Sequence, residues 1–298
     1  MPGEERISDM MLDVFMDSLL DAGLDSLKLL PFLFVTYLAM EWMEHLSGDR
    51  LQKKVSSAGK SGPLWGSLLG VVPQCGFSAA AASLYSGRVI TLGTLFAVFL
   101  STSDEMLPIL ISEEIAIPVI LKILLTKVVI AILSGFAIEY VFVTVLKKEE
   151  GKVNIHKICE HEHCKCREGV LRSALFHTVK IFIYILIFSL ILNLVIGFFG
   201  EDRLAFIFSG APIIGEMAAA LVGLIPNCAS SVLITELYLQ GIIDSGAMMA
   251  GLLCNAGVGM LVLFRLNEDR KENIRILMLL YFTAVIWGIL IHFTGFQF

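Results

Sequence analysis

The chain has 298 residues, of which 56% are hydrophobic and 17% charged, and its mean hydropathy is +0.80. A soluble protein must cover its surface with polar groups, and this composition leaves too few of them. The formal net charge is −6, and no nucleic-acid partner is expected. The composition therefore excludes an ordinary soluble domain and predicts an all-α integral membrane protein that has the lipid bilayer as its solvent.

The first 26 residues are expected to form an amphipathic helix. Aspartates recur at every fourth position, from Asp9 to Asp25, and apolar side chains occupy the opposite side. The segment is acidic and has no small-residue cleavage site after an apolar core, so it lacks the pattern of a signal peptide. We interpret it as a helix at the membrane interface, with a gating lid as the alternative.

Four later runs are apolar enough and, at roughly 20 residues, long enough to cross the hydrocarbon core as helices. They are Leu27 to Met43, Ile117 to Val145, Ile181 to Phe199 and Ile274 to Phe293.

An internal repeat connects two membrane regions. Adding 153 to the residue numbers between Gly70 and Ala97 leads to related residues without a gap, and the carboxamides Gln74 and Asn227 also correspond. The chain is therefore predicted to be a duplication, with an N-terminal helix (residues 1–26), a first membrane repeat (27–146), a linker (147–172) and a second membrane repeat (173–298). The identical pairs are Gly70/Gly223, Pro73/Pro226, Cys75/Cys228, Ser78/Ser231, Leu84/Leu237, Tyr85/Tyr238, Ile90/Ile243, Gly93/Gly246 and Ala97/Ala250.

Charged loops orient the two repeats, because Lys and Arg accumulate on the cytoplasmic side. Equivalent loops carry opposite charge, which predicts an inverted repeat with a cytoplasmic linker and both termini outside. The basic loops contain Arg50, Lys53, Lys54 and Lys60 in the first half and Arg265, Arg270, Lys271 and Arg275 in the second, and their acidic counterparts contain Glu201 and Asp202, and Glu113 and Glu114.

The motif segment of each half is expected to be a re-entrant helical hairpin. Only about 50 residues join the inside loop at Lys60 to the outside loop at Glu113. Three full crossings within this length would place Arg88 outside and would leave too few residues for the last crossing. Each half then has five helical segments, including a hairpin and an interrupted crossing helix. The expected arms are Gly62 to Val72 and Phe77 to Tyr85 in the first half, and Gly215 to Ile225 and Ala229 to Leu239 in the second.

The hairpin tips are the candidate substrate site, because irregular backbone at membrane depth is tolerated only where it is buried in protein or lines a cavity. The alternative is that these small residues only allow close helix packing. The candidates at the tips are Gln74, Cys75 and Ser78 in the first half, and Asn227, Cys228, Ser230 and Ser231 in the second.

The crossing helix after each hairpin is expected to be interrupted, at Ser101 to Glu105 and at Cys254 to Gly259. An ionisable group inside the membrane costs at least roughly 2.5 kcal/mol and marks a functional candidate. Asp104 is the candidate cargo or proton carboxylate, and Asn255 lies in the second break. Candidate coupling residues are Asp104, Lys127, Glu216 and Glu236.

The linker contains six imidazole and thiol groups within eleven residues, enough to close a tetrahedral site for Zn²⁺ or another borderline ion. A solvated linker with incidental Cys and His is the alternative. These groups are His156, Cys159, His161, His163, Cys164 and Cys166.

The Pro-Gln-Cys-Gly-Phe-Ser and Pro-Asn-Cys-Ala-Ser-Ser segments, the ten helical segments and the Cys/His-rich linker resemble the ten-helix heavy-metal exporters. This family is related by name to the arsenic-efflux permeases and is often labelled as manganese transporters. The resemblance covers nearly the whole chain and implies export of a metal or metalloid.

The sequence thus predicts a secondary active transporter in the cell membrane that exports a divalent transition metal or metalloid, with proton coupling as an option. It contains no P-loop motif to power a pump, no enzyme activity is expected, and no cofactor is expected apart from an optional metal ion in the linker. The expected metal ligands are Cys75, Cys228 and Asp104. The alternatives are a carrier of anions or small organic solutes and a membrane metal sensor. The expected partners are the cargo and the lipid bilayer, and a homodimer is a further option.

Overall fold

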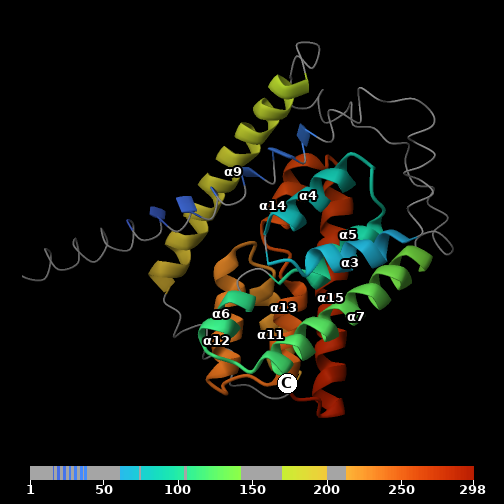
Figure 1. Cartoon of the computed structure of the whole chain (residues 1–298), viewed down its shortest axis with the longest axis vertical. Coiled ribbons are helices and arrows are strands. Elements are labelled where there is room, and N and C mark those ends of the chain that lie inside the picture. The colour runs from blue at the N-terminus through green and yellow to red at the C-terminus, as the bar shows by residue number, and fades with distance from the viewer. Residues whose placement is uncertain are drawn as a thin grey trace, which may run out of the picture.

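The described part of the chain is helical. The computed structural model describes residues 61–73, 75–103, 106–141, 170–199 and 213–298, together with single helical positions between 16 and 38. Within these residues, helices are the only regular elements (Figure 1). Most of the N-terminal segment, the linker up to residue 169 with all of its Cys and His residues, and the residues Gln74 and Asp104 lie outside the described residues.

In the described residues of the first half, five helices precede the linker. The first two flank the Pro73 turn, and the next two flank the break near Thr102. They are α3 (Gly62–Gly70), α4 (Cys75–Ser86), α5 (Leu92–Ser101), α6 (Met106–Ser112) and α7 (Ile117–Tyr140).

The second half repeats this order after α9 (Val170–Phe199), a helix of 30 residues. Its helices are α11 (Ile214–Gly223), α12 (Cys228–Leu239), α13 (Ser245–Cys254), α14 (Val258–Leu266) and α15 (Arg270–Thr294). Both α4 and α12, and both α5 and α13, begin 153 residues apart. The repeat seen in the sequence therefore extends to the bounds of the helices.

The two halves interlock. In each half the first arm packs on the helix before the break, α3 on α5 and α11 on α13, and the long last helix packs on the same partner, α7 on α5 and α15 on α13. The second arm contacts the other half as well as its own: α4 packs extensively on α14, and α12 packs less extensively on α6 (Figure 1). The indole Nε1 of Trp287 donates a hydrogen bond of 2.8 Å to Ser134 Oγ, and these two residues also occupy equivalent positions, 153 apart.

Four stretches in the described residues are long and apolar enough to cross a bilayer: Leu92–Ser112, Ile117–Tyr140, Ser245–Leu266 and Arg270–Thr294. They differ in burial, since 94% of the most apolar part of Ser245–Leu266 is buried, against 33% for Ile117–Tyr140 and for Arg270–Thr294. The outward side chains of α7 and α15 are mostly large and apolar, which suits a surface that faces lipid. Examples are Leu121, Leu125, Leu133, Phe282, Ile286 and Leu290.

A polar network joins the halves at the start of α15. Glu272 accepts hydrogen bonds from Arg88 at 3.2 and 2.6 Å, from the Tyr85 hydroxyl at 3.0 Å and from Asn267 at 3.1 Å. Hydrogen bonding to this carboxylate raises the pKa of the Arg88 guanidinium. Arg88 has the left-handed backbone angle φ of 57°, which is uncommon for a residue other than glycine, and its bidentate pair with Glu272 holds that turn against α15.

Candidate functional site

Two helix breaks are buried in the described bundle. In the first half, α5 ends at Ser101 and α6 begins at Met106. In the second half, α13 ends at Cys254 and α14 begins at Val258, so both interruptions lie where the sequence predicted them. The side chain of Asn255 bridges the second break, because its Oδ1 accepts a 2.9 Å hydrogen bond from the backbone N–H of Gly257. Gly257 has φ of 51° and ψ of −143°, a conformation that is open to glycine and strained for other residues.

The second tip forms a tight polar turn before α12. Asn227 is the N-cap residue of this helix and is buried. The hydroxyl of Ser230 turns back and donates to the carbonyl oxygens of Asn227, at 2.8 Å, and Ile225, at 3.2 Å. These bonds satisfy carbonyl groups that hydrocarbon could not solvate.

The first tip helix touches the second break directly. A Cβ placed on Gly259, at the start of α14, would lie 2.7 Å from the carbonyl group of Ser78 on α4. Only glycine permits this approach of the two backbones, because any side chain would displace the Ser78 backbone. The contact places a residue from the first tip beside the broken helix of the other half.

Lys127 on α7 reaches both broken helices. Its side chain is fully buried, and its ammonium group donates hydrogen bonds to the carbonyl oxygen of Thr102, at the end of α5, and to that of Leu252 on α13, at 3.3 Å. Both acceptors lie at the C-terminal ends of short helices, where the helix dipole is negative and favours a cation. A buried positive charge thus lies where the breaks of the two halves approach each other.

The family model described as "Putative, 10TM heavy-metal exporter" matches residues 10–164 and 141–268. The chain belongs to this family. It is therefore a multi-pass membrane protein of a transporter family, and the resemblance noted in the sequence is confirmed. No curated protein and no solved structure matches the chain.

The predicted site residues of this exporter-family member divide into three groups. Ser78, Lys127, Asn227, Ser231 and Asn255 are described and buried. Cys75 and Cys228 begin α4 and α12, but their thiol groups are not among the described side chains. Apart from Glu216 and Glu236, the other predicted site residues lie outside the described residues: Gln74, Asp104 and the linker set His156, Cys159, His161, His163, Cys164 and Cys166.

The two glutamates predicted to couple transport occupy different surroundings. Glu236 is half-buried on α12. Glu216 is buried near the start of α11 and lies close to Asp244 and His292, neither of which was predicted as a site residue from the sequence. Cys254 was also not selected as a ligand, although it ends α13 as a buried free thiol whose Cβ lies close to Gly223.

Proposed function

We propose that the protein is a secondary active transporter that exports a divalent transition metal or metalloid through a central site between two hairpin tips. The observation that carries the proposed cargo is the match to the heavy-metal exporter family. The contacts of Lys127 with the broken helices of both halves support the location of the site. The contact between Ser78 and Gly259 supports the same location. A binding site that both halves build can be exposed to either side when the halves rock against each other.

The proposal treats the halves as an inverted repeat with re-entrant hairpins. Reciprocal contacts support a twofold relation, since α4 packs on α14 while the equivalent α12 packs on α6. The contact between Ser134 and Trp287 adds to this, because equivalent residues touch each other where a twofold axis passes between them. The opposite charges of equivalent loops are the reason for placing this axis in the membrane plane.

The proposed cargo ligands combine soft and hard groups. Cys75 and Cys228 would supply thiolates, Asp104 a carboxylate, and Gln74 and Asn227 amide oxygens. Thiolates favour soft or borderline ions, whereas carboxylate and amide oxygens favour ions such as Mn²⁺. Ser78, Ser231 and Asn255 would line the site, and Asp104, Lys127, Glu216 and Glu236 would couple export to protons.

A carrier of anions or small organic solutes is the second candidate, and the buried ammonium group of Lys127 favours it. The half-helix N-termini at the two tips would also attract negative cargo. Uptake into inverted membrane vesicles separates the candidates. We expect radiolabelled Mn²⁺ or Zn²⁺ to accumulate, and accumulation of organic anions alone would contradict the metal proposal. A membrane metal sensor, the remaining alternative, would move neither.

The proposed topology predicts where single cysteines react. Cysteines placed at positions 54 and 164 should be cytoplasmic, and cysteines at 114, 201 and 298 should face outside, because of the Lys/Arg asymmetry of the loops. An impermeant thiol reagent applied to intact cells should therefore label only the second group. Labelling of position 54 from outside would contradict the inverted orientation, and labelling after permeabilisation is the control for accessibility.

The linker is expected to regulate transport without carrying cargo. A deletion of Cys159 to Cys166 should change the apparent metal affinity or the regulation of export and leave export measurable, because a loop site cannot move an ion across the bilayer. The rate of metal export against metal concentration measures this. Complete loss of export from a deletion variant that still folds and inserts would refute this division.

A further inference from the structure

Three side chains from separate helices converge at the end of the bundle where the chain terminates. Glu216 lies near the start of α11, Asp244 is the N-cap residue of α13, and His292 lies in the last turn of α15. One ligand atom from each lies within 4.8 Å of the other two. Imidazole and carboxylate together are the ligand set of Zn²⁺, Mn²⁺ and Co²⁺ in proteins.

Each carboxylate uses one oxygen for the backbone and directs the other to His292. Glu216 Oε2 accepts a 2.6 Å hydrogen bond from the N–H of Ile213, and Asp244 Oδ1 accepts a 2.8 Å hydrogen bond from the N–H of Ala247. Asp244 Oδ2 contacts His292 Nδ1, and Glu216 Oε1 lies 3.2 Å from the same nitrogen. The backbone bonds fix the two carboxylates in place, as outer hydrogen bonds do for metal ligands.

This arrangement leaves one buried oxygen without a donor. A ring nitrogen carries at most one hydrogen, so His292 Nδ1 can donate to Asp244 or to Glu216 and not to both. Glu216 is only 2% exposed, and its Oε1 atom has no hydrogen-bond partner in the described structure. No lysine or arginine of the described residues pairs with either carboxylate. Buried polar atoms are nearly always satisfied, so an unpaired carboxylate oxygen calls for a further partner.

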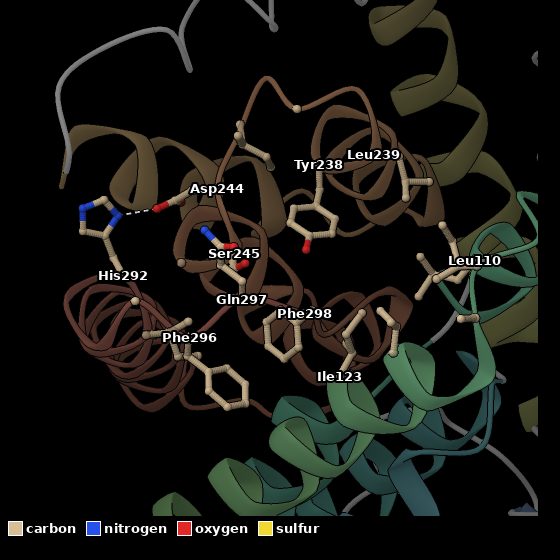
Figure 2. A pocket seen from close by; sticks show the side chains of 18 residues that line it. Leu110, Ile123, Tyr238, Leu239, Asp244, Ser245, His292, Phe296, Gln297 and Phe298 are labelled. Carbon is tan, nitrogen blue, oxygen red and sulfur yellow. Dashed lines mark hydrogen bonds and ion pairs between the residues drawn. The ribbon is translucent and has the colours of Figure 1, made fainter.

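The cluster opens to a cavity of about 710 Å³. Asp244 and His292 line it and are 45% and 28% exposed, whereas Glu216 lies behind them. Figure 2 shows Asp244 and His292 together at one side of the cavity, with the apolar side chains of Leu110 and Ile123 at another side. A hydrated ion can therefore approach the cluster from the cavity and meet the buried oxygen last.

We propose that Glu216, Asp244 and His292 form a binding site for a divalent transition-metal ion, separate from the central site. The ion would replace the proton between His292 Nδ1 and Asp244, accept the free oxygen of Glu216 as a third ligand and keep water from the cavity as the rest of its shell. Two carboxylates balance its charge, and the absence of a thiol among these ligands disfavours soft ions. The equivalent positions in the first half are Pro63, Thr91 and Glu139, so the site belongs to the second half alone.

The test measures metal binding to the purified full-length protein in detergent, so it does not depend on the proposed transport function. Co²⁺ is the probe, because its visible d–d absorption reports nitrogen and oxygen ligands and is distinct from the charge-transfer bands that the linker thiolates would add. We expect Glu216→Gln, Asp244→Asn and His292→Asn each to weaken one class of Co²⁺ binding by at least about tenfold. The matched control is Glu268→Gln, which removes the same charge from an exposed residue before α15.

Thermal unfolding of the same purified samples checks that the variants fold. Asn is as good an N-cap residue as Asp, so Asp244→Asn should keep the start of α13 intact even if Glu216→Gln is destabilising. Because the ion would link three helices, Zn²⁺ should raise the thermal midpoint of the wild type and of Glu268→Gln more than that of the three variants. Binding and thermal shifts equal to the wild type in Asp244→Asn and His292→Asn would overturn the proposal, as would Co²⁺ binding that shows only thiolate bands.

Discussion

Replacing Asp104 with Asn is expected to lower metal export by tenfold to a hundredfold. A charge-assisted contact contributes about 1.5 to 3 kcal/mol, and a dehydrated cation that loses one carboxylate ligand is left with poorly compensated charge. Cys75→Ser should weaken export for the same reason, with the larger effect on softer ions such as Zn²⁺. Initial rates of radiolabelled Mn²⁺ and Zn²⁺ uptake into inverted vesicles, normalised to the amount of inserted protein, measure both effects.

The matched control for this experiment is again Glu268→Gln, an exposed acidic residue outside the proposed path. If the cargo is an anion, Asp104→Asn should be mild or should even increase uptake, because it removes a repulsive charge. Wild-type metal export in both Asp104→Asn and Cys75→Ser would eliminate the proposed central site.

The helices could be predicted closely from the sequence because the repeat marks them twice. The predicted arms of the first hairpin, Gly62 to Val72 and Phe77 to Tyr85, end within two residues of α3 and α4. Pro and Gly at the tips, and short polar residues at the breaks, interrupt long apolar runs that have no other reason to stop. The packing of α4 on α14 could not be predicted in this way, because a pattern of hydrophobic residues does not identify the partner helix.

The central candidate residues could be predicted from the sequence more easily than the cluster of Glu216, Asp244 and His292. Lys127 is conspicuous as a charge near the middle of a long apolar run, and the structure brings it to both breaks. Asp244 instead resembles an ordinary loop charge, and His292 lies near the end of an apolar helix without a neighbouring motif. A comparison of the two halves does contain a signal, because Glu216, Asp244 and His292 differ from their counterparts Pro63, Thr91 and Glu139. Only the folded chain shows that these three positions meet.

Replacing Lys127 with Met should separate metal binding from net export. The ammonium group contacts the carbonyl oxygen of Thr102 at the C-terminal end of α5, and Thr102 lies two residues before Asp104 in the chain. A unit charge about 6 Å from another interacts by about 3 kcal/mol at an effective dielectric constant of about 20. Removal of this positive charge should therefore tighten binding of a divalent cation at the central site by at least about tenfold. Equilibrium binding of Mn²⁺ to the purified variant measures this gain.

Net export by Lys127→Met should fall by at least about tenfold even though binding improves. After cargo leaves, the ammonium group would neutralise Asp104 and allow the empty carrier to return, whereas an unpaired carboxylate is costly inside the membrane. Exchange of labelled for unlabelled Mn²⁺ requires only the loaded carrier to move, so it should persist in Lys127→Met. Lys127→Arg, which keeps the charge, should retain part of the net export. A purely structural lysine would lose exchange and net export together, and that result, or unchanged net export in Lys127→Met, would refute the coupling role.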